Sequence, residues 1–180
     1  MSPYEGGPFV VTGTLAGREL EEAVVVEIAA LLSDGMPAKL AAITAAIADD
    51  VILADPAEFI LGERPAVRFP AVWVLATDAV RPVEENLTDG EWPLGVWQHT
   101  VEIVVAATDP SNPEILRTRL YRYVRAITEV LMGHTTYVEN VSDWHKLYVQ
   151  GHAMTRVFQH VETNLFRQDA AVIALVTRTD

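Results

Sequence analysis

The sequence predicts an α+β fold, in which a mostly antiparallel β-sheet of about four to five strands carries helices packed on one face. Two regions repeat apolar residues at helical spacing, and residues 97–107 alternate apolar and polar side chains as a strand does. The elements follow in the order helix, helix, strand, strand, helix, strand, strand. With 180 residues, we expect a single domain over 1–180 that buries a sizeable core.

Two consecutive helices are predicted in residues 18–49. Apolar residues recur on one face of the first helix, at Leu20, Val24, Ile28, Leu31 and Leu32. The stretch "SDGMPAK" is expected to break the helix, with Gly35 as the C-cap and Pro37 opening a second helix over 38–48.

The sheet and a central helix are predicted within residues 69–177. The strands are expected at 69–78, 97–107, 152–163 and 170–177. The last one, "AAVIALV", is apolar on both faces and is therefore expected in the centre of the sheet. Two long loops are predicted at 77–95 and 133–152.

The central helix follows the turn "ATDPSNPE", with Ser111 or Asn112 as N-cap, Pro113 in its first turn and Gly133 at its end. A strand, a turn and a helix N-terminus can hold a phosphate. This turn lacks the glycines that such sites use, and Asp109 and Glu114 would repel an anion. The sequence therefore predicts no nucleotide site and no cofactor.

Net charge argues against general nucleic-acid binding. The chain carries a formal net charge of -12, whereas DNA binding draws most of its affinity from lysine and arginine on phosphates. DNA that passes an acidic wall without specific binding remains compatible with this charge. No apolar run approaches the roughly 18 residues that cross a bilayer, and no signal peptide is recognisable, so we expect a soluble protein made in the cytoplasm.

Four arginines lie within nine positions of the central helix: Arg117, Arg119, Arg122 and Arg125. Helical geometry places Arg117, Arg122 and Arg125 away from the apolar stripe and Arg119 at its border. One interpretation is a solvated helix face. The other is a contact with an acidic surface of a neighbouring subunit, for which the planar guanidinium is suited.

Other chemical signatures are absent from the sequence. The chain has no cysteine, no GxSxG and no DxDxDG pattern, and its five histidines lack the spacing of a zinc site and are expected on half-exposed strands or loops. We therefore predict no catalytic, cofactor-binding or metal-binding residues. Aromatic residues in the two long loops are further candidates for a subunit interface, unless these loops fold back on their own domain: Trp92, Tyr137, Trp144 and Tyr148.

Three segments together resemble the tail terminator (tail-completion or neck) proteins of long-tailed bacteriophages. They are "DPAEFILGERPAVRFPAVWVL", "WQHTVEIVVAATDPSNPEILRTRLYRYVRAITEVL" and the terminal pair of strands, in that order, over roughly residues 50–177. The two N-terminal helices and the 77–95 loop are more elaborate than in the simplest members.

The resemblance implies a structural virion protein with no catalysis and no cofactor. Such a protein forms a homo-oligomeric ring, typically a hexamer, in the tail or neck of the virion after assembly in the host cytoplasm. It caps the tail tube protein and joins it to the head-tail connector protein, with DNA passing through the channel. Three alternatives stay open: another head-tail connector or completion protein, a small α+β enzyme or ligand-binding domain with a site under the long loops, and a non-viral oligomeric scaffold.

Overall fold

The computed structural model describes residues 20–80, 96–133, 144–160 and 164–179 of the chain. Two helices pack against a sheet of six strands: α1 (Leu20–Ile47), α2 (Pro113–Met132), β1 (Glu58–Leu61), β2 (Ala71–Val80), β3 (Val96–Asp109), β4 (Trp144–Met154), β5 (Phe158–His160) and β6 (Leu165–Thr179).

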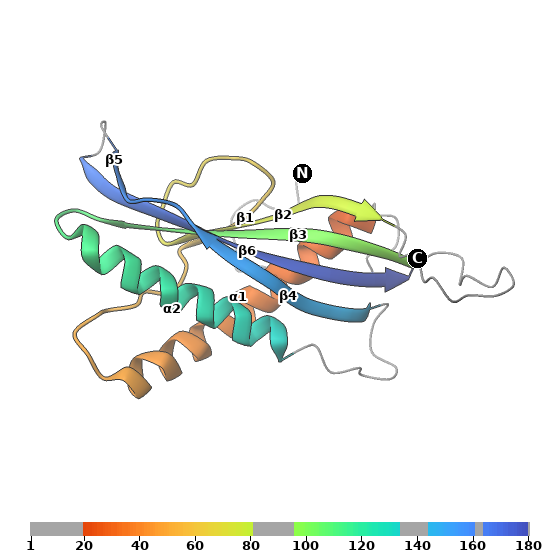
Figure 1. The fold of residues 1–180 in the computed structure, drawn as a ribbon, viewed down its shortest axis with the longest axis horizontal. Coiled ribbons are helices and arrows are strands. Elements are labelled where there is room, and N and C mark those ends of the chain that lie inside the picture. The colour runs from red at the N-terminus through yellow and green to blue at the C-terminus, as the bar shows by residue number, and fades with distance from the viewer. Residues whose placement is uncertain (1–19, 81–95, 134–143, 161–163, 180) are drawn as a thin grey trace, which may run out of the picture.

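The strand order is β1-β2-β3-β6-β4, and β5 pairs with β6 after β4 has ended. Only the β1–β2 pair is parallel among these strands. Figure 1 shows α1 and α2 on the same side of the sheet. The predicted α+β fold with helices on one face is confirmed, with six strands rather than four to five. The predicted central position of the last strand is also confirmed, because β6 lies between β3 and β4.

The main core lies between the helices and the sheet. It takes alternate residues of β2, β3 and β6, among them Val74, Ile103 and Val172, and the apolar faces of both helices. A smaller cluster of Ile60, Ala71, Trp73 and Ala106 lies on the other side of the sheet, called the outer face below. The alternation in β3 also places His99 on the helix side, where it is fully buried. The expectation of a half-exposed histidine was wrong there, because His99 shares the parity of the buried Val101.

The strand–turn–helix segment follows its sequence signals closely. The Asn112 side chain accepts hydrogen bonds from the Glu114 and Ile115 amides at 3.1 and 3.3 Å, and Pro113 begins α2. Gly133 caps the other end of the helix. These signals act over a few residues, so they could be read without the tertiary structure.

The predicted break in the N-terminal helix is wrong, because α1 runs unbroken through Gly35 and Pro37. The reason is a tertiary contact. Gly35 packs so closely on α2 that a Cβ atom there would lie 2.9 Å from both methyl groups of Val130, and Met36 beside it is fully buried. This packing stabilises the helix across the point where Pro37 removes a backbone donor.

Two strands lie where connections were predicted. β4 (residues 144–154) begins inside the predicted 133–152 loop, and β1 lies in the segment before β2. The single strand predicted from residue 152 to 163 is wrong, because β4 ends at Met154 and β5 begins at Phe158. Irregularities in the pairing of β4 with β6, at Trp144/Lys146 and Val149/Gly151, break the alternation that marks a strand. β1 has only four residues. Neither described helix is long and apolar enough to span a membrane.

Candidate functional site

The arginines of α2 have different environments. Arg122 is 6% exposed, and its guanidinium forms a two-pronged ion pair with Asp49, with Nη1 donating to Oδ1 at 2.8 Å and Nη2 donating to Oδ2. Its expected position on a solvent-facing side was wrong, because the chain after α1 folds over this side of α2. These bonds lower the pKa of the Asp49 carboxyl.

Tyr123 binds the same segment after α1, at Ala54. Its hydroxyl donates a hydrogen bond to the Ala54 carbonyl at 2.7 Å, and the side chain is 1% exposed. Burial raises the pKa of the Tyr123 hydroxyl to about 12. Arg122 and Tyr123 thus attach residues 49–54 to α2, which is an intramolecular role.

Arg119, in the second turn of α2, binds the turn that precedes the helix. Its Nη1 donates to Asp109 at 2.8 Å, and the other oxygen of Asp109 accepts the Ser111 and Asn112 amides at 2.9 and 2.7 Å. The amide bonds, from Ser111 first, lower the pKa of Asp109. The turn is therefore closed by its own carboxylate, as expected of a capping device.

Arg117 and Arg125 face solvent, and Tyr121 lies between them at helical spacing with 49% exposure. Arg125 also forms an ion pair with Glu129 at 2.7 Å, which lowers the pKa of Glu129, and its side chain remains 54% exposed. We call Arg117, Tyr121 and Arg125 the α2 stripe. Arginine and tyrosine are enriched in protein interfaces. Tyr121 was not among the predicted interface residues, although its spacing of four residues from each arginine places all three on one helix face.

The predicted aromatic residues are only partly placed. Trp92 and Tyr137 lie outside the described residues. Trp144 is the first residue of β4, and Tyr148 of the same strand is 38% exposed on the outer face. Tyr148 lies on the outer face and the α2 stripe lies on the helix side of the sheet, so the two do not form one surface.

An arginine–aromatic cluster on the outer face was not predicted. The guanidinium carbon of Arg167 lies 5.3, 5.7 and 5.9 Å from the ring centres of Phe69, Trp73 and Phe158. Asp169 accepts two hydrogen bonds from Arg167 at 2.8 and 3.0 Å. Since these residues come from three separate segments, the cluster joins the loop before β2 and strand β5 to β6 by cation–π attraction.

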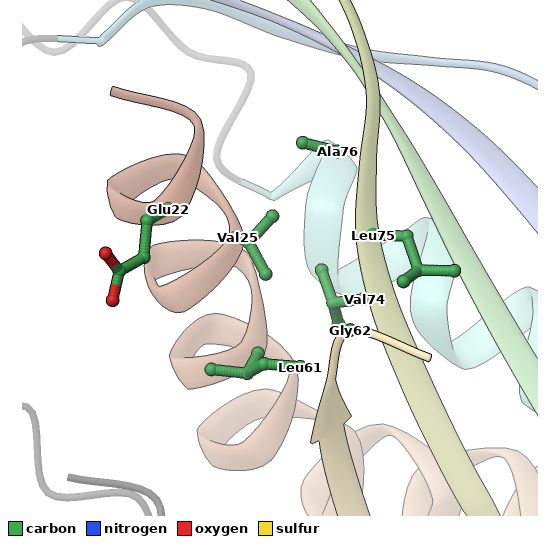
Figure 2. A pocket seen from close by; sticks show the side chains of 7 residues that line it. All are labelled: Glu22, Val25, Leu61, Gly62, Val74, Leu75 and Ala76. Carbon is green, nitrogen blue, oxygen red and sulfur yellow. The ribbon is translucent and has the colours of Figure 1, made fainter. Parts of the chain in front are cut away.

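A groove of about 400 Å³ lies where β1 ends beside β2. Figure 2 shows Val25 of α1 facing Val74 and Ala76 of β2 across it, with Leu61 at the end of β1. Glu22 is the acidic residue of a mostly apolar lining. Within the described ranges, no group of three or more histidine, aspartate or glutamate side chains is placed to hold a metal ion.

No protein-family model matches the chain, and no curated protein matches it. Among solved structures, the chain is similar to one chain of a structure described as the virion of a native gene transfer agent (GTA) particle. The two share 13% sequence identity at a TM-score of 0.37, over 80% of this chain and 92% of the other. This structural similarity is distant.

Proposed function

We propose that this protein is a structural virion assembly protein that forms a ring and acts as a tail terminator. In this role it caps the tail tube protein, joins it to the head-side connector and performs no catalysis. The resemblance of its three segments to tail terminator proteins supports the proposal.

The observation that carries ring formation is the α2 stripe. Arg117 presents positive charge on a chain whose formal net charge is -12, and Arg125, although paired with Glu129, remains 54% exposed. The exposed ring of Tyr121 lies between them. Exposed carboxylates are available on other parts of the same chain, for example Asp34 and Asp50. A basic stripe on one copy and acidic surface on the next make a head-to-tail contact, and such contacts close into rings when the rotation allows.

Arg119 and Arg122 are poor targets for testing this contact, although sequence analysis placed them in the interface. Charge reversal at Arg122 would put a buried carboxylate beside Asp49, and reversal at Arg119 would disturb the turn before α2. The subunit-contact role is therefore assigned to the α2 stripe, where substitution leaves these bonds intact.

Native mass spectrometry of the full chain tests the proposal. We expect a closed oligomer, typically a hexamer, and we expect Arg117→Glu with Tyr121→Ala to shift it toward monomers while the far-UV circular dichroism is unchanged. Arg68→Glu makes the same charge change at a side chain that is 72% exposed in the loop before β2, beside the start of β1, and should leave the oligomer intact. A wild-type chain that stays monomeric at high concentration with tail tube protein present would refute ring formation.

Tube assembly separates the tail terminator from the neighbouring roles. Added to polymerising tail tube protein, the ring should bind tube ends and stop growth. Rings that bind the connector and ignore tube ends would indicate a head-completion protein instead.

A further inference from the structure

The sheet has two open edges in the described part of the chain. β4 forms one edge, since β6 is its only described strand partner. β2 forms the other over Leu75–Val80, because β1 pairs only with Ala71–Val74. Gly62, with φ +85, ends β1 at this point. A strand edge presents unpaired backbone donors and acceptors to any strand that approaches it.

The two open edges lie at the same level of the sheet. Asp78 pairs with Thr100 of β3, Thr100 pairs with Leu175 of β6, and Leu175 pairs with Tyr148 of β4. We call such a row of paired residues across the sheet a rung. The next rung runs in the same way from Ala79 to Leu147. The open part of β2 is therefore level with residues 146–151 of β4, although three strand spacings separate them.

Charge also distinguishes the two edges. Residues 144–160 contain no aspartate or glutamate in a chain with 25 acidic residues. They include Lys146 in β4 and Arg156 between β4 and β5. The β2 edge carries Glu22 in the groove and the exposed Asp78, while the exposed Glu63 and Arg64 after Gly62 offset each other. Opposite charges on two edges favour pairing between them over pairing of like edges.

We propose that β4 of one copy pairs with the open part of β2 of the next copy, so that the sheet continues through the ring. This inference rests on the proposed ring and identifies its subunit contact. The partner is thus a second copy of this chain, and the contact is strand addition supported by the apolar groove beside β2.

The topology of the chain suits this contact. The sheet runs from one open edge to the other through four strands that alternate in direction, in the order β2, β3, β6 and β4. Rotation about an axis along the strands preserves strand direction and level, so β4 of one copy would meet β2 of the next in antiparallel orientation and at matching height.

The two helices lie under different ends of the strand order, α1 toward the β2 edge and α2 toward the β4 edge. α1 packs mainly on β1 and β2, whereas α2 packs on β6, β3 and β4. Continuing the sheet therefore brings α2 of one copy, with its basic stripe, beside α1 of the next, which carries Glu22 and Asp34. Strand pairing and the charge contact of the α2 stripe are then two layers of one interface.

Disulfide crosslinking tests the pairing, because the chain has no cysteine of its own. The variant Asp78→Cys with Tyr148→Cys places two thiols on one rung and on the same outer face. Within one copy these positions lie three strand spacings apart, about 14 Å, which is too far for a disulfide. Across an antiparallel contact the Cα atoms would lie about 4.5–5.5 Å apart, within the disulfide range.

On a non-reducing denaturing gel of the oxidised variant, we expect a ladder of covalent oligomers that ends at the ring size and collapses with reductant. The matched control, Asp78→Cys with Ala153→Cys, moves the second thiol five residues along β4 and should stay uncrosslinked. Val80→Cys with Lys146→Cys tests the rung two residues further along in the same way if the first variant folds poorly.

The outcomes separate this inference from the proposed function. Rings that form normally but crosslink in neither rung-matched variant would overturn strand pairing and leave the ring standing. Equal crosslinking in the Ala153 control would also overturn it. A monomeric wild-type chain would refute the ring itself.

Discussion

Gly35 should be a position where alanine destabilises a helix, although alanine is the better helix former. In the interior of α1, Gly35→Ala alone would gain about 1 kcal/mol from helix propensity. The added Cβ, however, would lie 2.9 Å from both Val130 Cγ1 and Cγ2, whereas carbon atoms normally pack at about 3.5–4.0 Å. Val130 is 4% exposed and β-branched, so it has little freedom to turn away.

Overpacking of this kind costs about 1–3 kcal/mol. The cost exceeds the propensity gain, so we expect Gly35→Ala to lower the free energy of unfolding by about 1 kcal/mol. In a Val130→Ala background both methyl groups are gone, and the nearest remaining atom, the Cβ of residue 130, is at 3.5 Å. There the same substitution should stabilise by about 1 kcal/mol, which gives a coupling of about 2 kcal/mol between the two sites.

Urea unfolding of the four proteins measures this cycle, and each 1 kcal/mol should move the midpoint of thermal unfolding by about 2–4 °C. Ala41→Gly, at an exposed position of α1, calibrates the propensity contribution without any contact to α2. If Gly35→Ala stabilised the protein equally in both backgrounds, the close helix contact would not exist and the explanation for the unbroken helix would fail.

Further predictions concern the contacts between α2 and the connector after α1. The pKa of Tyr123 is raised above its unfolded value of about 10 to about 12, so its contribution to stability should be complete below pH 10 and lost as the pH rises to 12. Alkaline unfolding should show this loss, and Tyr123→Phe should abolish it while costing about 1 kcal/mol for the bond to Ala54. Asp49→Asn should destabilise more than Arg122→Met, because it leaves a side chain that is 7% exposed with its charge unpaired, whereas Asp49 is 41% exposed and can be hydrated. Equal losses in urea unfolding would contradict this asymmetry.

Sequence patterns predicted the elements whose signals are local. Residues within one turn of α2 define its caps, and alternation within β3 defines its strand and its buried face. The uninterrupted apolar run of β6 predicted its central position. The helices cover one face of this strand, and Ala171, Ile173 and Leu175 on the other face are only partly buried. The candidate site was predicted in part: Arg117 and Arg125 are exposed as helical geometry required.

Contacts between distant segments decided the rest. The sequence by itself determined an acidic α+β chain with its helices on one face of a mostly antiparallel sheet. Only the tertiary structure decided that α1 continues through Gly35, because Val130 of α2 stabilises the packed helix there. It also decided that Arg122 is buried, because its partner Asp49 lies 73 residues away. Sequence periodicity predicts which residues share a face of one helix or strand, whereas the burial of that face depends on the segment that packs against it.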